Sequence, residues 1–394
     1  MLVYSILMRN NKENNRLCGI IFSNSKIRKV GSEMKVDDRV RGVLNVDESL
    51  IQQVITTKAF QRLKGIKQLG NSYFFTNTAT NNRFEHSIGV YENMKRIISV
   101  LECKGSIKLN DDIKMLAYVS ALLHDIGHGP FSHAFETITN VHHETWTTNV
   151  IMEDKELNKL LDSDMKENVI SIYKHRGKFP IIEELLFSQL GADKLDYHAR
   201  DLSASKIDSV SFSIDDLISH LEWESGKLVI EASGVLFVEQ YLHVRRTLFL
   251  QVFCHLNTVA KDILLKKVLL RAHQINELDI KKIDVDSFLS MNDDSIHYLI
   301  QGWKHSEDSI LKQLSVLYME PKETFRFQYE ELTRKEFESI NTHHVFEVLY
   351  KENPAYGFYK GGIRIYQQSD IYHFSSSIKE VMATKERYFK FTFI

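Results

Sequence analysis

Residues 122–133, LLHDIGHGPFSH, constrain the fold and chemistry of this chain more than any other stretch. An apolar run over residues 115–123 ends abruptly there in a cluster of ionisable side chains, which are His124, Asp125, His128 and His133. Neutral imidazole and carboxylate groups are the ligands of a borderline or hard divalent metal ion. Gly127 and the Gly129-Pro130 pair have the character of a stop signal that would pin the helix end. The segment therefore predicts an apolar helix that ends at a metal or catalytic site.

A lone histidine near a helix end has a simpler explanation, as a satisfied polar residue or a favourable charge on the helix dipole. Packing alone does not require three histidines and a carboxylate next to glycines, so the metal or catalytic interpretation is preferred here. His86 and Asp193 complete an H…HD…D pattern with the His124-Asp125 pair. Four such ligands from three helices can hold one metal ion and leave positions for water or phosphate.

Two other charged segments have more than one reading. Residues 193–201 are dense in ionisable groups, and on a helix Asp193 would share a face with Asp196 and Tyr197. A solvated surface is the usual meaning of such a segment, but the apolar residues mixed into it argue against a simple solvent face. Arg245 and Arg246 lie in a hydrophobic stretch, which suits either an anionic ligand or a structural ion pair.

The composition describes an ordinary globular protein. The chain has 394 residues, 43% of them hydrophobic and 26% charged, and only four prolines, which favours a mainly helical fold. A net charge of −2 gives no global drive toward nucleic acid or an anionic membrane, although a local basic groove for nucleic acid remains open. Three scattered cysteines form no disulfide framework, and no run is long and apolar enough to span a membrane. We expect a cytoplasmic protein.

The order of the patterns predicts four parts: an N-terminal leader or short strand segment over 1–34, a helical core over 35–273, a helical extension over 274–340 and a small α+β region over 341–394. The expected elements of the core are a strand-turn-strand around Gly42, a long helix near 235–273 broken once, and helices over 47–63, 83–102, 111–123 and 143–152. Residues 284–340 predict two or three further helices, and the strands expected after them cover 345–350, 362–366 and 388–394.

Four motifs in this order resemble the HD-domain superfamily, and most closely its deoxynucleoside triphosphate (dNTP) triphosphohydrolase branch. They are FQRLKGIKQLG at 60–70, NRFEHSIG at 82–89, LHDIGHGPFSH at 123–133 and DKLDYHARD at 193–201. The resemblance runs from about residue 35 to 271 and more weakly to 329. It implies a helical HD bundle that hydrolyses dNTPs at the α-phosphate to a deoxynucleoside and inorganic triphosphate. It also implies a homo-oligomer, a dimer or tetramer.

The resemblance assigns roles residue by residue. The positions that match its metal ligands are His86, His124, Asp125 and Asp193. The positions that match its phosphate-lining and hydrolytic groups are His128, His133 and His143, with Glu136 as acidic partner. Further phosphate contacts match Arg83, Lys194 and Arg245, and positions around the sugar match Gln68, Leu69, Tyr197 and Asp201. One divalent ion, Mn, Fe, Zn, Mg or Ni, is implied at each site, and a further Mg²⁺ can accompany the triphosphate.

The chain departs from the family at several positions. Thr56 and Lys64 stand where an activator guanine is read in one member, and Leu256 replaces a basic residue of a second activator site, so activation of that kind is not expected. Phe253 replaces a frequent tyrosine of the substrate pocket. Two alternatives stay open: a phosphohydrolase for other nucleotides or phosphoesters, and a nucleotide-sensing regulatory or nucleic-acid-binding module.

Overall fold

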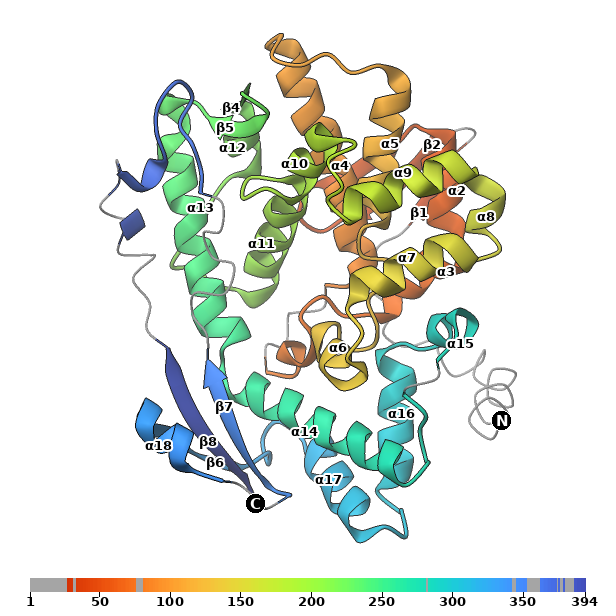
Figure 1. Ribbon diagram of the computed structural model, residues 1–394, viewed down its shortest axis with the longest axis vertical. Helices are drawn as coiled ribbons and strands as arrows, with labels where there is room; N and C mark the ends of the chain where they lie inside the picture. The colour runs from red at the N-terminus through yellow and green to blue at the C-terminus, as the bar shows by residue number, and fades with distance from the viewer. Residues whose placement is uncertain are drawn as a thin grey trace.

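The computed structural model describes residues 27–30, 33–75, 81–280, 283–341, 345–352, 362–373, 375, 378–379 and 386–394. These residues form a mainly helical protein with small antiparallel sheets, which confirms the predicted fold class (Figure 1). The expected N-terminal leader lies almost wholly outside the described residues, as does much of the region near 353–361.

The first sheet is an antiparallel meander of β1 (Ile27–Val30), β2 (Glu33–Asp38) and β3 (Gly42–Val46). The predicted turn lies at Gly42, whose φ of +78° suits glycine. Met34 pairs with Val46 and buries the same face of the hairpin. Strand β2 begins at Glu33, so the expected boundary between residues 34 and 35 falls inside a strand.

The single helix expected over 47–63 is wrong, because the chain breaks at Thr57. Its place is taken by α2 (Ser49–Thr56), α3 (Lys58–Gln61) and the 3-10 turn η2 (Arg62–Gly65), with a further turn, η3 (Gly70–Phe74), after them. Thr57 has an extended ψ of 149°, and its hydroxyl accepts a hydrogen bond from the amide of Phe60. A threonine that caps the second helix thus interrupts the apolar periodicity of the first.

The centre of the core is α4 (Arg83–Cys103), which packs between α5 (Asp111–Leu123) and α11 (Ala192–Ser205). Asn82 caps α4 and Asn110 caps α5, each accepting an amide hydrogen with its side-chain oxygen. Neighbours on two sides bury both the apolar and the polar residues of α4. This packing brings its first turn against the end of α5 and the start of α11.

Further elements surround this centre (Figure 1). They are α6 (His133–Thr139), α7 (His143–Glu153), α8 (Leu157–Leu160), α9 (Ser163–Tyr173), α10 (Pro180–Phe187), α12 (Ile214–Ser219), the hairpin of β4 (Leu221–Glu224) and β5 (Lys227–Ile230), and η4 (Ala232–Gly234). The helix predicted from His143 is α7.

The long helix expected near 235–273 is broken once, as predicted. Helix α13 (Val235–Leu248) continues into a π-helical turn, η5 (Phe249–Phe253), and α14 (Leu256–Gln274) leaves at a bend of 54°. Among the described residues no single helix is long and apolar enough to cross a membrane, although residues 232–253 and 256–274 together pass that test as a bent pair. Short π-helical turns are frequent at functional sites.

Residues 284–340, all of which the structure describes, form four helices, not two or three. They are α15 (Val285–Leu289), α16 (Asp293–Trp303), α17 (Ser309–Met319) and α18 (Arg334–Ser339). A strand, β6 (Phe327–Leu332), lies among them and pairs with β8 (Arg387–Phe393), which also pairs with β7 (Glu347–Glu352). The C-terminal sheet therefore takes strands from both sides of residue 340. The strand expected at 362–366 is reduced to bridges, one of them between Ile365 and Ile230, followed by the turn η6 (Ile371–His373).

Candidate active site

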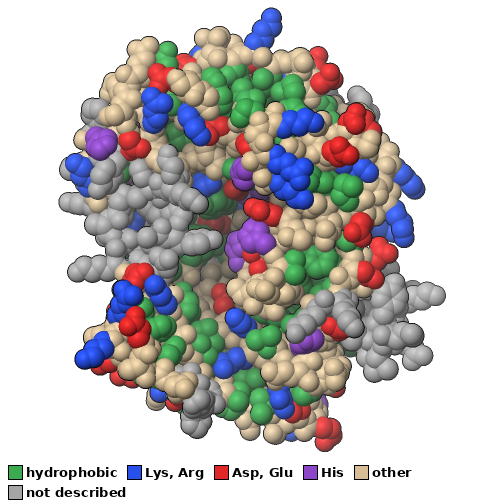
Figure 2. Space-filling model, in the orientation of Figure 1, with side chains coloured by type: hydrophobic (Ala, Val, Ile, Leu, Met, Phe, Trp, Pro, Cys, Tyr) green, Lys and Arg blue, Asp and Glu red, His purple; other side chains and the backbone are tan. Residues whose placement is uncertain are grey.

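A cavity of about 500 Å³ opens where α4, the end of α5, α11 and α13 meet. Figure 2 shows the molecule hollowed near its middle, with histidine side chains at the edge. The predicted site residues that line this cavity are Gln68, Arg83, His86, Asp125, His128, His133, His143, Asp193, Lys194, Tyr197, Asp201 and Arg245. Residues far apart in the sequence therefore converge on one cavity.

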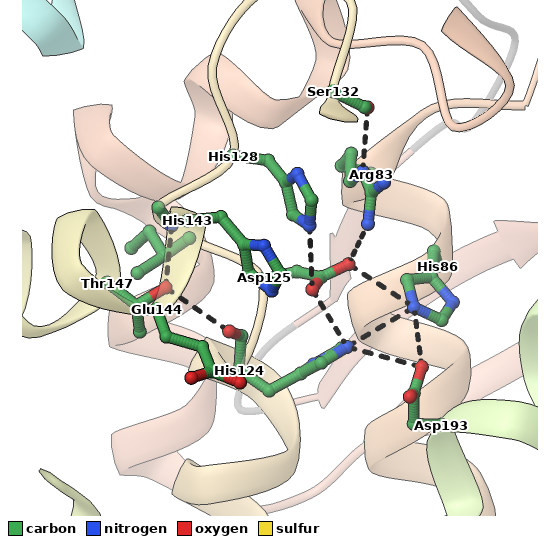
Figure 3. Close-up of polar contacts among 12 residues, drawn as sticks. Arg83, His86, His124, Asp125, His128, Ser132, His143, Glu144, Thr147 and Asp193 are labelled. Carbon is green, nitrogen blue, oxygen red and sulfur yellow. Dashed lines mark hydrogen bonds and ion pairs between the residues drawn. The ribbon is translucent and has the colours of Figure 1, made fainter. Parts of the chain in front are cut away.

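Two imidazoles and two carboxylates meet on one side of the cavity (Figure 3). Nε2 of His86 lies 3.2 Å from Nε2 of His124 and 3.2 Å from Oδ1 of Asp193. Asp125 places Oδ2 at 3.4 Å from the first imidazole and Oδ1 at 3.3 Å from the second. We call these four residues the HD group.

The hydrogen bonds on the far side of each ring fix the tautomers in the HD group. Nδ1 of His124 lies 2.9 Å from the carbonyl oxygen of Ala121, which can only accept, so this nitrogen donates. Nδ1 of His86 donates in the same way to the Asp196 carboxylate at 2.8 Å. A metal ion binds the neutral form of these rings, in which each Nε2 atom carries a lone pair that faces the other Nε2 and two carboxylates. A cation between them resolves the repulsion among four acceptors, so these residues fit a divalent metal ion.

The charge balance around His86 agrees with a cation site. Burial alone would lower its pKa, but hydrogen bonds to Asp193 and Asp196 and the charge of Asp125 outweigh burial and raise the pKa to about 9. Burial would raise the pKa of Asp193, but His124 and His86 hold it well below its usual value. The carboxylates thus remain ionised and attract positive charge.

Glycine in this motif provides space rather than the predicted stop signal. Helix α5 ends at Leu123, and His124 follows in right-handed helical geometry, before either glycine. A Cβ on Gly127 would stand 2.1 Å from the amide nitrogen of Thr147 and 2.3 Å from the carbonyl oxygen of His143. The missing side chain lets α7 approach the turn that follows His124 and Asp125, and that contact brings His143 to the cavity.

A second set of residues lies beside the HD group and comprises His128, His133, Glu136 and His143, which we call the His–Glu group. Oε1 of Glu136 accepts from Nδ1 of His133 at 3.0 Å and from Nδ1 of His143 at 2.7 Å. Burial would raise the pKa of Glu136, but these two histidines hold it well below its usual value. The ring of His128 stacks on His143 with centroids 4.0 Å apart, and burial lowers the pKa of His128 well below 6.5.

Three cationic side chains line the cavity. Arg83 pairs with Asp125, and its Nε donates to the hydroxyl of Ser132 at 3.1 Å. Nζ of Lys194 donates to the carbonyl oxygen of Phe187 at 2.7 Å, and burial lowers the pKa of this lysine. Arg245, on α13, donates to the amide oxygen of Gln189 at 2.7 Å. An anionic ligand with several charges would satisfy such a cavity.

The predicted sugar contacts divide into two sets. Oε1 of Gln68 and Oδ1 of Asp201 are buried without a hydrogen-bond partner among the described residues, and burial raises the pKa of Asp201 to about 7. These atoms and Tyr197 are available to a ligand. Leu69 is not among the residues that line the cavity, because it packs with Val244 in a neighbouring apolar cluster and is 6% exposed.

Sequence reasoning missed the role of Asp196. Its carboxylate accepts from His86, from Arg41 at 2.6 Å and from Arg200 at 2.8 Å, and it is completely buried. A Cβ on Gly89 would stand 2.0 Å from Oδ1 of Asp196, so only glycine leaves room for this network. The i,i+4 pairing of Asp196 with Arg200 was the available signal.

The strained turn before α6 has no signal in the sequence. Phe131 and Ser132 have φ of +58° and +55°, which is unfavourable for side chains of this kind. The hydroxyl of Ser132 donates to the carbonyl oxygen of Lys67 at 3.0 Å and accepts from Arg83. The turn therefore orients a cavity arginine.

Comparison with known proteins agrees with this geometry. The family model of the HD domain matches residues 83–212. An uncharacterized protein of Bacillus subtilis, YwfO, is 30% identical over 352 residues, which cover 83% of this chain and 79% of that protein. The chain belongs to the HD-domain family. Membership of the HD phosphohydrolase family supports a hydrolase. HD domains bind divalent metal ions, and the cluster that includes His86, His124 and Asp193 could hold one.

More distant relatives of this HD-domain protein include one with a named activity. The deoxynucleoside triphosphate triphosphohydrolase SAMHD1 homolog of Dictyostelium discoideum is 27% identical over 285 residues, 66% of this chain and 53% of that protein. A phosphohydrolase from Bacteroides thetaiotaomicron has the same fold, with a TM-score of 0.78 at 23% identity over 91% of this chain and 99% of that one. A hypothetical protein from Aquifex aeolicus follows with a TM-score of 0.73 at 23% identity, over 93% of this chain and 96% of that one.

Proposed function

We propose that this HD-domain protein is a metal-dependent dNTP triphosphohydrolase, which releases a deoxynucleoside and inorganic triphosphate. One observation carries the proposal: a single cavity of about 500 Å³ joins the HD group, the His–Glu group and the three cations Arg83, Lys194 and Arg245. A nucleoside triphosphate has the size and charge for such a cavity. The similarity to relatives named as dNTP triphosphohydrolases supports the substrate class.

The HD group would hold the metal ion. The ion, when bound, supplies Lewis acidity and a water of lowered pKa at the α-phosphate. Arg83 stands between Asp125 and the cavity and can neutralise charge that develops on the phosphate oxygens. Lys194 and Arg245 come from α11 and α13 and can bind the outer phosphates.

The His–Glu group would move the protons. Nδ1 of His133 and Nδ1 of His143 donate to Glu136, so Nε2 of each ring is the atom free to exchange a proton with substrate or water. As water attacks the α-phosphorus, one imidazole takes the proton of the water at Nε2. The bond between the α-phosphorus and the nucleoside oxygen breaks, and the imidazolium returns that proton to the alkoxide that leaves. Glu136 stabilises the positive charge on a ring that has taken a proton.

Selection of deoxyribose is part of the proposal. The apolar contact expected from Leu69 does not support it, since this side chain packs beside the cavity. Gln68, Tyr197 and Asp201 line the cavity and can contact the sugar. The similarity to relatives named as dNTP triphosphohydrolases supports the selection of deoxyribose.

Product analysis tests the proposal. The purified protein with Mn²⁺ and no activator is given each dNTP and each NTP, and the released phosphate species are separated by chromatography. We expect triphosphate and deoxynucleoside from dNTPs alone, and no product from the double variant His124→Ala/Asp125→Ala. Mono- or diphosphate products would refute dNTP triphosphohydrolysis and indicate another phosphohydrolase activity. No product with any mixture of dNTPs would favour a nucleotide sensor.

We also propose that the protein assembles as a homo-oligomer, by resemblance to its family. Light scattering on the purified chain tests this. A mass of two or four times 45.9 kDa is expected, and a single chain mass would exclude it.

A further inference from the structure

The His–Glu group has the composition of a metal site in its own right. His128, His133, Glu136 and His143 place one nitrogen or oxygen atom each within 4.8 Å of one another. We propose that this group binds a second transition-metal ion, of the Zn²⁺ class, and that its occupancy blocks hydrolysis at the neighbouring HD group. Binding of the ion does not depend on the proposed substrate, whereas the block rests on the proposed function.

The spacing suits a tetrahedral ion. Oε1 of Glu136 lies 2.7 Å from Nδ1 of His143, 3.0 Å from Nδ1 of His133 and 3.9 Å from Nδ1 of His128. Ligands at the usual Zn–N distance are separated by roughly 3.3 Å along each edge of the tetrahedron. The observed separations lie on both sides of that value, so small side-chain rotations complete the geometry.

His128 supplies the decisive ligand atom. Its side chain is 1% exposed, and its Nδ1 makes no hydrogen bond among the described residues. Its Nε2 lies 3.3 Å from Oδ1 of Asp125, and an ionised carboxylate can only accept, so this nitrogen carries the ring proton and donates a hydrogen bond. The remaining lone pair on Nδ1 therefore points toward Glu136 in a buried space. A histidine oriented by a carboxylate behind it is the usual arrangement of a metal ligand.

The group is open to ions from solvent. The side chain of His133 is 70% exposed and that of His142, which lies 3.6 Å from Glu136, is 55% exposed. His128 contacts the HD group through Asp125, and the two groups have no histidine in common. Two ions can therefore bind without sharing any of the nitrogen ligands.

An ion at this position stops the proton transfers proposed for the group. A neutral imidazole that binds metal through Nδ1 carries its proton on Nε2 and cannot accept another there. His133 and His143 would both be fixed in that form. One equivalent of Zn²⁺ per chain should then support hydrolysis through the HD group, and a second equivalent should abolish that hydrolysis.

Metal counting on the full chain tests the site without substrate. The protein is equilibrated with Zn²⁺, freed of loose metal by gel filtration and analysed by mass spectrometry. We expect two ions per chain in the wild type, one in His133→Ala, one in His86→Ala/His124→Ala, which leaves Asp125 behind His128, and two in the matched control His175→Ala, another exposed histidine beside a glutamate. One ion in the wild type, or two retained by His133→Ala, would overturn the site.

A spectroscopic test separates loss of the site from loss of folding. Co²⁺ in the His86→Ala/His124→Ala protein should give the intense visible bands of a tetrahedral ion, and adding His133→Ala should abolish them while circular dichroism stays unchanged. Weak octahedral bands would contradict the geometry. Hydrolysis is then followed in the wild type with one and with two equivalents of zinc. Equal rates would refute the block and leave the ion count as evidence for the site alone.

Discussion

The substitution Asp196→Asn tests how the HD group is oriented. Oδ2 of Asp196 accepts from Nδ1 of His86 and from Nε of Arg200, each at 2.8 Å, whereas Oδ1 accepts from Arg200 at 3.0 Å and from Arg41 at 2.6 Å. An asparagine must turn its NH₂ toward one of these pairs. A bound metal ion keeps His86 neutral. The Oδ1 position then faces two charged donors and the Oδ2 position only one, so we expect the NH₂ to face His86.

The consequence is a changed tautomer at the metal ligand. Nδ1 of His86 must then accept, its proton moves to Nε2, and the lone pair offered to the metal is lost. Loss of such an outer partner lowers metal affinity by roughly 10–100-fold, or about 1.4–2.7 kcal/mol. Breaking a buried ion pair costs roughly 3–5 kcal/mol, and we expect the lower end because Arg200 retains Asp38 at 2.8 Å and Arg41 retains Asn93.

Competition with a chromophoric chelator measures the affinity, and urea denaturation of the metal-free protein measures the stability. Nitrogen NMR of the histidine rings reports the tautomer directly. Asp215→Asn is the matched control, since it removes a carboxylate that pairs with Arg96 at the surface and is 77% exposed. Unchanged metal affinity in Asp196→Asn, with His86 still protonated on Nδ1, would refute the argument.

Three further changes address the surroundings of the site. Gly89→Ala should destabilise the protein by about 1–3 kcal/mol in urea denaturation, because its methyl group overlaps Asp196; an unchanged midpoint would contradict the crowding. Asp262 has its pKa raised to about 6 by burial, so the stability it contributes is complete below pH about 3.8 and is lost as the pH rises through 6. Asp262→Asn keeps the acceptor for Asn71 and should gain about 3 kcal/mol at pH 8 but nothing at pH 4, and equal gains would refute the assignment. Asp293→Asn turns an NH₂ toward one of two backbone amides and should cost about 1–3 kcal/mol in the same assay, with no loss expected for the exposed Asp294→Asn.

The His/Asp cluster that could hold a metal ion could be predicted from the sequence because few other roles suit these residue types. His124 and Asp125 interrupt an apolar run. His86 lies in the first turn of a helix whose N-cap residue, Asn82, can be recognised from the sequence. Local signals of this kind depend on neighbours within a few residues. The fold class followed in the same way from helical periodicity.

Features that depend on distant contacts could not be predicted. Asp196 resembles one more charge on a helix until Arg41, 155 positions earlier, is placed against it. The motif glycines were interpreted as helix stops, but Gly127 is required by the backbone of a helix twenty residues further along. Leu69 was assigned to the sugar pocket by resemblance, and its packing partner Val244 lies on α13. Sequence patterns identify residue types and periods but not the partners that decide such positions.

The candidate site also depends on a segment beyond the matched HD region. Asp293, in the first turn of α16, is 1% exposed and accepts the amide of Lys67 at 3.0 Å and the amide of Phe131 at 2.7 Å. The first amide precedes Gln68, and the second lies in the strained turn that carries Ser132. A helix N-terminus stabilises the carboxylate that makes both bonds, although burial raises its pKa to about 6. Because one buried side chain fixes two cavity loops, the helices after residue 283 are part of the scaffold of the site. The similarity to solved structures over more than nine tenths of the chain is consistent with that requirement.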